Sequence, residues 1–302
     1  MRVVLLGTAA GGGFPQWNCW CPTCRTARAD PGRAHPRLQS TAAISADGER
    51  WFLLNASPDI RQQVACLPGS VPRALRHVPI EGVVATDAEL DHSVGILLLR
   101  EAGRLQLWCT AAVRTILERD SRILPVTGAF AELSVSEMGI GEPVALRYRD
   151  GSASGLVIEP VEVPAGPPRF ARDAEPGHTV GLLIGDRVTG GSCAFLPGCG
   201  DLTPALLRRL ADTDLVLFDG TFWTDDELVS LGIGSRTARE MDHLPVSGEG
   251  GSLARLAGLS RPKKVYTHIN NSNPMLVEDS PERSAVERAG LEVGADGMTF
   301  MV

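Results

Sequence analysis

The stretch Thr86-Asp87-Ala88-Glu89-Leu90-Asp91-His92-Ser93-Val94-Gly95 contains four side chains that can bind a metal within six residues. It follows a predicted strand, Val83–Ala85, and precedes an apolar segment with helical periodicity. In α/β proteins the carboxyl ends of strands build the ligand site, and this stretch begins where such a strand ends. It therefore predicts a metal or catalytic site at a strand-to-helix turn, with a solvated acidic loop as the alternative.

Short β-branched or leucine-rich runs alternate with helical patterns along most of the 302 residues. The predicted strands are Arg2–Leu6, Trp51–Asn55, Gly82–Thr86, Leu105–Cys109, Leu156–Val163, Val180–Ile184, Leu215–Asp219, Lys264–Ile269 and Met298–Val302. The predicted helices are Pro58–Leu67, His92–Arg100, Ala111–Arg119, Pro204–Asp212, Asp225–Leu231, Leu253–Leu259 and Pro281–Ala289. This alternation is typical of an α/β fold, and no boundary divides it, so we predict one domain over residues 1–302.

Composition excludes several classes of protein. A net charge of −7 argues against general nucleic-acid binding, and 5% aromatic residues leave few platforms for stacking bases. The longest aliphatic run, Val94–Leu99, is far shorter than the ~20 residues of a membrane span. The apolar run at Met1–Gly7 is too short for a signal peptide. We therefore expect a cytoplasmic protein without a membrane or nucleic-acid partner.

Three of the seven cysteines fall in the segment 18–24, as Cys19, Cys21 and Cys24. Three thiolates this close are natural ligands for a tetrahedral zinc ion, and an odd cysteine count suits a metal better than disulfides. A fourth ligand must come from elsewhere in the chain. We predict a structural zinc loop here, with three buried thiols as the alternative.

The stretch 86–95 resembles the T-H-x-H-x-D-H-x-x-G signature of the metallo-β-lactamase superfamily. Asp91, His92 and Gly95 match it, while Asp87 and Glu89 stand where the first two histidines belong. Later segments follow the same order: Gly200-Asp201 resembles the bridging-aspartate turn, Asp219–Phe222 and Met241–Leu244 resemble segments of the phosphodiesterase branch, and Thr267-His268-Ile269 resembles the last metal histidine. The resemblance implies an αββα sandwich with metals at the edges of the sheets.

Two further segments narrow the resemblance. The run Gly7–Cys19 with its following C-x-x-C, and His268–Pro274, are similar to the coenzyme PQQ synthesis protein B family. That family implies a role in making pyrroloquinoline quinone (PQQ) from a Glu-Tyr unit, through oxygen-dependent hydroxylation of the tyrosine ring. The implied partners are a small-molecule or dipeptide precursor and other proteins of the PQQ pathway.

The acidic replacements change the metal chemistry that the superfamily implies. The usual fold holds two metals, but here the first ligand set is lost, and Asp91, His92 and His268 survive from the second. Two imidazoles and one carboxylate form the facial triad of non-heme Fe(II) oxygenases. We therefore expect one catalytic Fe²⁺ beside one structural Zn²⁺. Asp87 and Glu89 become candidate catalytic residues, as supports for a ligand or as proton acceptors.

Several assignments stay open at this stage. Asp201 is a further catalytic candidate, as a ligand or as a group that orients one. His268 could instead complete the cysteine site, and His178 and His243 are candidates for either site or for substrate binding. A non-catalytic carrier of PQQ or its precursor is the alternative function, with arginines such as Arg61, Arg169 or Arg236 pairing with carboxylates. Hydrolysis is the weakest hypothesis because the first two histidines are missing.

Overall fold

In the computed structural model, which describes residues 1–69, 72 and 74–302, the strands form two seven-stranded sheets. The first sheet, in spatial order, consists of β14 (Thr299–Met301), β1 (Arg2–Gly7), β2 (Thr41–Ser45), β3 (Trp51–Leu54), β4 (Ile80–Val84), β5 (Arg104–Cys109) and β6 (Glu132–Glu137). The second consists of β13 (Glu292–Val293), β12 (Lys263–Thr267), β11 (Leu215–Asp219), β10 (Ser192–Leu196), β9 (Val180–Asp186), β8 (Ala153–Glu162) and β7 (Val144–Arg147). Strands β3 to β6 are parallel, as are β10 to β13.

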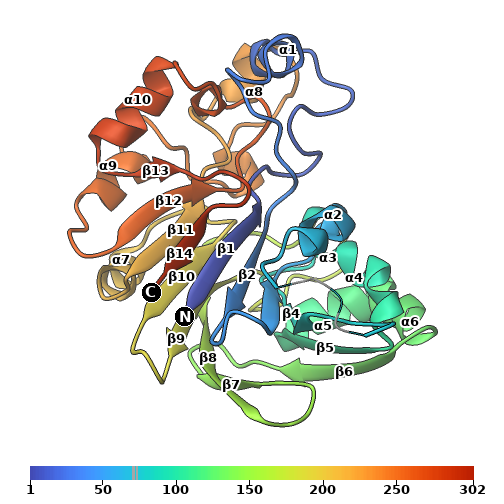
Figure 1. The fold of residues 1–302 in the computed structure, drawn as a ribbon. Helices are drawn as coiled ribbons and strands as arrows, with labels where there is room; N and C mark the ends of the chain where they lie inside the picture. The colour runs from blue at the N-terminus through green and yellow to red at the C-terminus, as the bar shows by residue number, and fades with distance from the viewer. Residues whose placement is uncertain (70–71, 73) are drawn as a thin grey trace.

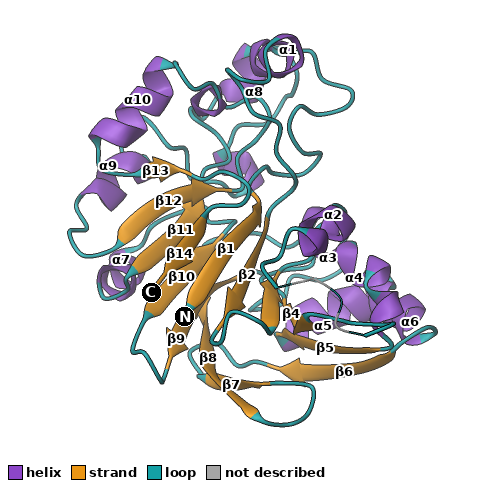
Figure 2. Cartoon of the chain, in the orientation of Figure 1, coloured by secondary structure: helices purple, strands orange, loops and turns teal. Residues whose placement is uncertain are grey.

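Helices cover the outer faces of both sheets, and the two chain termini lie side by side (Figures 1 and 2). Beside the first sheet lie α2 (Ile60–Ala65), α3 (Leu90–Ser93), α4 (Gly95–Leu98), α5 (Ala111–Thr115) and α6 (Ile123–Gly128). Beside the second lie α7 (Pro204–Ala211), α9 (Ser252–Ala257) and α10 (Pro281–Arg288), while α1 (Pro22–Ala29) and α8 (Glu227–Ser230) lie together at the top of Figure 1. Short 3₁₀ turns span Arg100–Ala102, Arg239–Met241 and Pro274–Leu276, and a π-helical turn spans Ile116–Asp120. The predicted αββα sandwich is confirmed.

The alternation of side chains along the central strands explains the layering. On β1, Val3 and Leu5 enter the core between the sheets, whereas Val4 and Leu6 enter the core under α2 to α6. Successive residues of a strand point to opposite faces, so a strand that is apolar at every position must be covered on both sides. Strand β11 repeats the pattern between the central core and the core under α7, α9 and α10.

The helix predicted over His92–Arg100 is wrong in its form. The chain instead makes two single-turn helices, α3 and α4, that meet at Val94. Gly95 allows this junction, because a Cβ there would lie 2.3 Å from the backbone oxygen of Ser57. The backbone N–H of Gly95 donates to the carbonyl oxygen of Ala56 at 2.9 Å. This bond holds the 86–95 stretch against the turn that follows β3. None of the described helices combines the length and the apolar character that a membrane-spanning helix needs.

Candidate metal centre

The candidate site lies where the two sheets meet, at the carboxyl ends of β4, β11 and β12. Single β-bridges close this junction: Ala9 pairs with Ile269, and Asp87 pairs with Thr179. Each bridge joins a residue that follows a strand of the first sheet to a residue beside a strand of the second. Polar residues that end separate parallel strands are thereby brought to one place, as the sequence predicted for α/β strand ends.

Asp91, His92 and His268 come together at this junction, with one potential ligand atom of each within 4.8 Å of the others. His268 Nε2 lies 3.2 Å from Asp91 Oδ2, and His92 Nε2 lies 3.9 Å from the same oxygen. The two imidazole rings lie edge to face with their centroids 5.0 Å apart. Residues 177 positions apart in the chain thus form a compact set of two imidazoles and one carboxylate.

The other ring nitrogen of each histidine is held by an oxygen. His92 Nδ1 lies 2.8 and 2.9 Å from the two carboxylate oxygens of Asp87, and His268 Nδ1 lies 2.8 Å from Thr221 Oγ1. Such a contact fixes both the ring orientation and the tautomer, and it leaves Nε2 free to bind a metal. Asp87 therefore supports His92, which is one of the two roles that the sequence left open for it.

His243 adds a third imidazole, which the sequence had named only as a candidate. Its Nδ1 lies 2.6 Å from Asp219 Oδ2, and its ring stacks on that of His268 with centroids 5.5 Å apart. Asp219 is fully buried at the end of β11 and also accepts from the hydroxyl of Thr221 at 2.6 Å. Sequence reasoning missed Asp219 as a site residue, although an acid that ends an otherwise apolar buried strand was a usable signal.

The donor set fits a cation. His92 Nε2 is buried and has no hydrogen-bond partner among the described residues, although a buried polar atom normally has one. That nitrogen faces the Asp91 carboxylate, which already contacts His268. A divalent ion that accepts two nitrogens and a carboxylate oxygen would satisfy all three groups.

Electrostatics at the site reflect the crowding of acids and imidazoles. Burial works against the charged form of His92, but Asp87 and Asp91 outweigh it and raise the pKa of His92 to about 9. Burial also disfavours ionisation of Asp91, yet His92 and His268 hold the pKa of that carboxyl far below its ordinary value. Burial, with the charges of Asp87 and Asp91, raises the pKa of Glu89 to about 7. Protons on these groups offset the negative charge of the clustered acids, and a bound cation would offset that charge instead.

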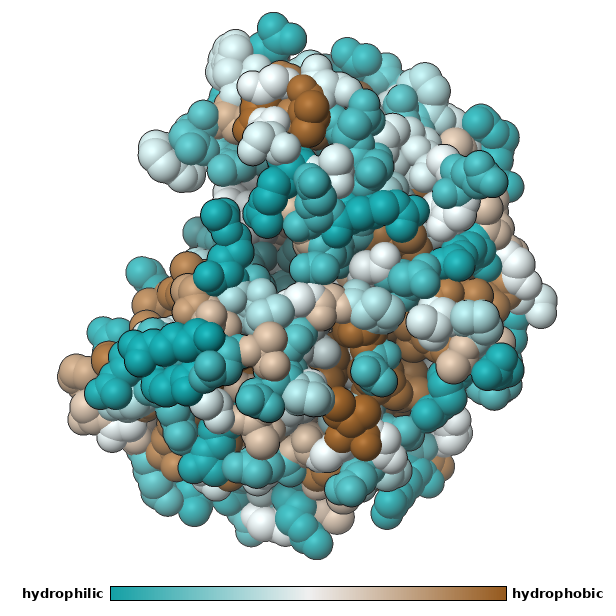
Figure 3. Space-filling view, turned by 180° about the vertical axis from the view of Figure 1, so that it is seen from behind, coloured by the Kyte–Doolittle hydropathy of each residue, from teal (hydrophilic) through white to brown (hydrophobic). Residues whose placement is uncertain are grey.

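A cavity of about 300 Å³ opens beside the donor set. Figure 3 shows that the molecule is hollowed on its rear face and that hydrophilic groups gather around the hollow. The residues that line the cavity are Ala10, Gly11, Asp87, Glu89, Asp91, His92, Ala165, Gly166, Pro167, Arg169, Thr179, Gly198, Thr221, Phe222, Arg236, Met241, Asp242, His243, His268 and Asn270. Glu89, Arg169 and Arg236 are among these lining residues, so the wall carries charged groups of both signs. The cavity can therefore hold a small polar ligand next to a metal.

Three residues named from the sequence lie elsewhere. Asp201 forms an ion pair with Arg255 and is absent from the described residues that line the cavity, so the structure does not bring it to the donor set. Arg255 on α9 binds the Asp201 side chain, whereas Asp219 contacts His243. His178 bonds to the hydroxyl of its neighbour Thr179, and Thr179 is the residue that reaches the cavity wall. Arg61 is exposed on α2, away from the cavity.

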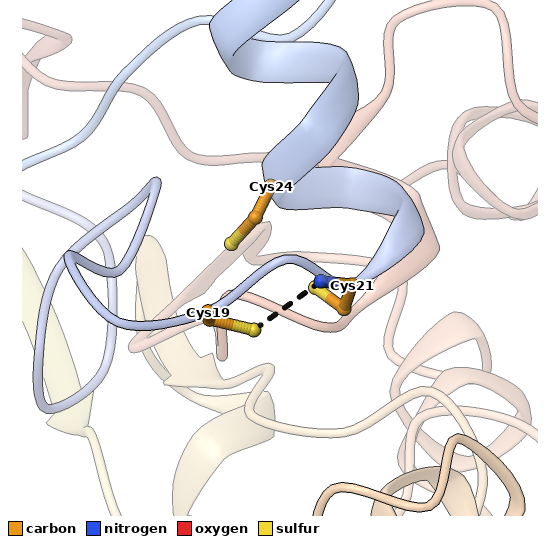
Figure 4. Close-up of side chains that lie close together, drawn as sticks. All are labelled: Cys19, Cys21 and Cys24. Atoms are coloured by element: carbon orange, nitrogen blue, oxygen red, sulfur yellow. Dashed lines mark hydrogen bonds between the residues drawn. The ribbon is translucent and has the colours of Figure 1, made fainter.

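Cys19, Cys21 and Cys24 form a second group of potential ligands at the start of α1 (Figure 4). The backbone N–H of Cys21 donates to Cys19 Sγ at 3.5 Å. The amide of Asn271 lies against the cluster, with Nδ2 at 3.2, 3.6 and 3.3 Å from the three sulfur atoms. An amide, and not the imidazole of His268, is thus next to the cysteines. The alternative in which His268 completes the cysteine site is corrected, because both its ring nitrogens are engaged in the other group.

Comparison with known proteins places the chain. A model of the beta-lactamase superfamily domain matches residues 50–269. The coenzyme PQQ synthesis protein B of Gluconacetobacter diazotrophicus is 44% identical over 98% of both chains, and that of Rhodopseudomonas palustris (strain BisB5) is 45% identical over 98% of both. The chain belongs to the coenzyme PQQ synthesis protein B family.

Solved structures agree with this membership. The crystal structure of Zn²⁺-bound PqqB from Methylobacterium extorquens superposes with a TM-score of 0.91 and 41% identity, over 100% of both chains. A diphosphatase from the PhnP family superposes with a TM-score of 0.68 at 18% identity, covering 100% of this chain and 97% of that one. The second likeness shows the shared fold alone. Within this fold, the family member described here has Asp87 and Glu89 at the positions where the superfamily signature has histidines.

Proposed function

We propose that the protein acts in PQQ biosynthesis as a non-heme Fe(II)-dependent hydroxylase of the tyrosine ring in a Glu-Tyr precursor. One observation carries the proposal: Asp91, His92 and His268 form a set of two imidazoles and one carboxylate at a cavity, and His92 Nε2 is unpaired within the part of the chain that the structure describes. Such a set leaves coordination positions open for O₂ and a substrate. The curated relatives named for PQQ synthesis supply the pathway.

Asp91, His92 and His268 would hold the catalytic ion, and Cys19, Cys21 and Cys24 would hold a structural zinc. The chemistry of three clustered thiolates supports the cysteine assignment, and a solved relative is described as Zn²⁺-bound. When iron is bound at the first set, it supplies the activation of O₂.

The overall step inserts one oxygen atom into a ring C–H bond of the tyrosine. The second oxygen atom leaves as water, which requires two electrons and two protons from a reductant such as ascorbate. Breaking the C–H bond releases one proton, and the new O–H bond retains one. The residues of this chain position the reacting ring and manage the protons around it.

Individual residues have separate tasks in this proposal. Asp87 keeps His92 in the tautomer whose Nε2 binds metal, and Thr221 does the same for His268. The carboxylate of Glu89 faces the cavity and is the candidate acceptor for a proton from the substrate. Gly11 lines the cavity next to Asp91. A Cβ at this position would lie 3.3 Å from Asp91 Oδ2, so a larger residue would crowd that carboxylate.

Iron-loaded protein incubated with Glu-Tyr, O₂ and ascorbate tests the proposal by mass spectrometry of the dipeptide. We expect a product heavier by one oxygen atom, whose label follows ¹⁸O₂ and not labelled water. Asp91→Asn and His268→Gln should abolish the product, whereas His35→Gln, at an exposed histidine outside the cavity, should retain it. Absence of a hydroxylated product from correctly folded, iron-containing protein would overturn the hydroxylase.

The carrier of PQQ or its precursor remains the second candidate, and the position of Arg169 and Arg236 in the cavity wall favours it. PQQ carries three carboxylates, which guanidinium groups recognise well. Calorimetry separates the two functions. Tight PQQ binding that persists in the His92→Ala and His268→Ala variants supports a carrier, and binding that vanishes with the metal ligands does not.

A further inference from the structure

Two arginines, Arg169 and Arg236, line the cavity from two different loops. Arg169 lies in the loop between β8 and β9, and Arg236 lies in the loop between α8 and the 3₁₀ turn Arg239–Met241. Arg169 is exposed and Arg236 is half-buried. Both are therefore placed where a ligand next to Asp91, His92 and His268 would extend outward.

Both loops are held in place around these arginines. Phe170 and Ala171, which follow Arg169, pack against the core under α2 to α6. Beyond Arg236, the buried Ala238 donates its backbone N–H to Asp225 O at 2.8 Å. A cation on an anchored segment loses less conformational entropy when it binds a ligand than a cation on a free loop.

The protein itself does not neutralise these two cations. Neither guanidinium makes an ion pair or a hydrogen bond with a described residue, although neighbouring arginines do. Arg172, three residues after Arg169, pairs with Asp120, and Arg255 on α9 pairs with Asp201. The two cavity arginines therefore have room for an anionic partner.

Two of the four acids that line the cavity are engaged by histidines, and the other two are Glu89 and Asp242. Asp87 is bonded to His92, and Asp91 faces His92 and His268. Of the remaining carboxylates in the wall, that of Asp242 lies close to the backbone of Gly166. The metal-binding end of the cavity is thus rich in acids, and the outer end carries the two arginines.

We infer that Arg169 and Arg236 determine substrate specificity by each pairing with one carboxylate of a dicarboxylate ligand, such as a dipeptide with an acidic side chain and a free C-terminus. Guanidinium and carboxylate groups form two parallel hydrogen bonds, which supply both affinity and orientation. With the acidic end held at the mouth, the other end of the ligand points towards Asp91, His92 and His268. This inference deepens the proposed function and rests on it for the nature of the ligand.

Binding without turnover tests the inference. Zinc-loaded full-length protein is titrated by calorimetry with Glu-Tyr, Gln-Tyr, Glu-Tyr amide and Gln-Tyr amide, which remove the side-chain carboxylate, the terminal carboxylate or both. The variants are Arg169→Gln and Arg236→Gln, with the charge-retaining Arg169→Lys and Arg236→Lys. Arg61→Gln, at an exposed arginine outside the cavity, is the matched control. The melting temperature of every variant is measured alongside.

We expect native protein to bind Glu-Tyr roughly ten- to a hundredfold more tightly than either singly neutralised dipeptide, the range typical of one charge-assisted pair. Each glutamine variant should lose affinity by a similar factor and should become insensitive to removal of one particular carboxylate. The lysine variants should restore part of the loss, and Arg61→Gln should bind like the native protein.

Three results would overturn the inference: no binding of Glu-Tyr by the native protein, equal loss of affinity for all four dipeptides in the arginine variants, or unchanged affinity in those variants. The outcome is separate from that of the hydroxylase test. Charge-selective binding without hydroxylation would sink the hydroxylase alone, and hydroxylation without charge selectivity would sink the arginine assignment alone.

Discussion

Replacing Asp87 with asparagine tests whether an acid at the position of a lost histidine now supports the metal site. The carboxylate of Asp87 is buried and contacts His92 Nδ1 at 2.8 and 2.9 Å. It also accepts from the Thr86 hydroxyl at 2.7 Å and from the Glu89 backbone N–H at 2.9 Å. Asparagine keeps one oxygen acceptor of similar shape, so the turn can retain a bond while the charge opposite His92 is lost.

The expected effect follows from that single loss. Partners that hold a metal-binding histidine typically contribute about ten- to a hundredfold to metal affinity, which corresponds to about 1.4 to 2.8 kcal/mol. We expect Asp87→Asn to weaken one metal-binding event by this factor and to leave the cysteine site unchanged. Competition with a coloured chelator measures the affinity, and Asp150→Asn, at a surface aspartate, is the control. Unchanged affinity at both sites would refute the support role of Asp87.

Further outcomes can be checked independently. His92→Ala should remove one metal equivalent and leave the cysteine-bound metal, whereas Cys21→Ser should do the reverse and lower the melting temperature, as elemental analysis and thermal unfolding would show. Phe52→Ala should reduce the free energy of unfolding by about 3 to 5 kcal/mol in a denaturant titration, because Phe52 is fully buried between the sheets, and Phe52→Leu should reduce it less. Partial burial works against ionisation of Asp47, but hydrogen bonds from two backbone N–H groups and an arginine outweigh it and lower its pKa to about 2. Its contribution to stability is therefore present above about pH 4 and lost as the pH falls towards 2, so Asp47→Asn should flatten the pH dependence of unfolding in that window.

Much of the fold could be predicted because its central strands contain continuous apolar runs. Runs such as Arg2–Leu6 and Leu215–Asp219 stand out from the surrounding polar sequence, and the structure has strands there. The strand β2 was missed because Thr41–Ser45 is short and alanine-rich, and its burial comes from its neighbours β1 and β3. The strand β13 was missed because it is only two residues long and forms by pairing with β12. Both strands form because they pair with neighbouring strands in the fold, and their own residues give little indication of a strand.

The candidate site was predictable where ligands cluster in the sequence and less so where the fold brings single residues together. The stretch around Asp91 and His92 and the cysteine triplet are local patterns, and the structure places each group in one spot. Asp219 depends on the parallel pairing of β11 with β12, which sets it beside Thr267 and so next to His268. Asp201 was chosen because Gly200-Asp201 resembles the bridging-aspartate turn of the superfamily, and in the structure its side chain pairs with Arg255. A residue's distance from a site along the sequence says little about which way its side chain points.

The replacement of histidines by acids has two effects that act together. Asp87 occupies the first histidine position of the superfamily signature, so it removes a ligand from the first metal set. In the structure the same carboxylate binds His92 Nδ1, so it strengthens a ligand of the remaining set. A residue without an oxygen acceptor at position 87 would produce only the first effect, because it could not hold His92 Nδ1. Under the proposal, the acid favours one well-held metal over two. Asp87→Asn tests this preference, because the proposal expects the variant to bind one metal more weakly and to take up no second ion at the site.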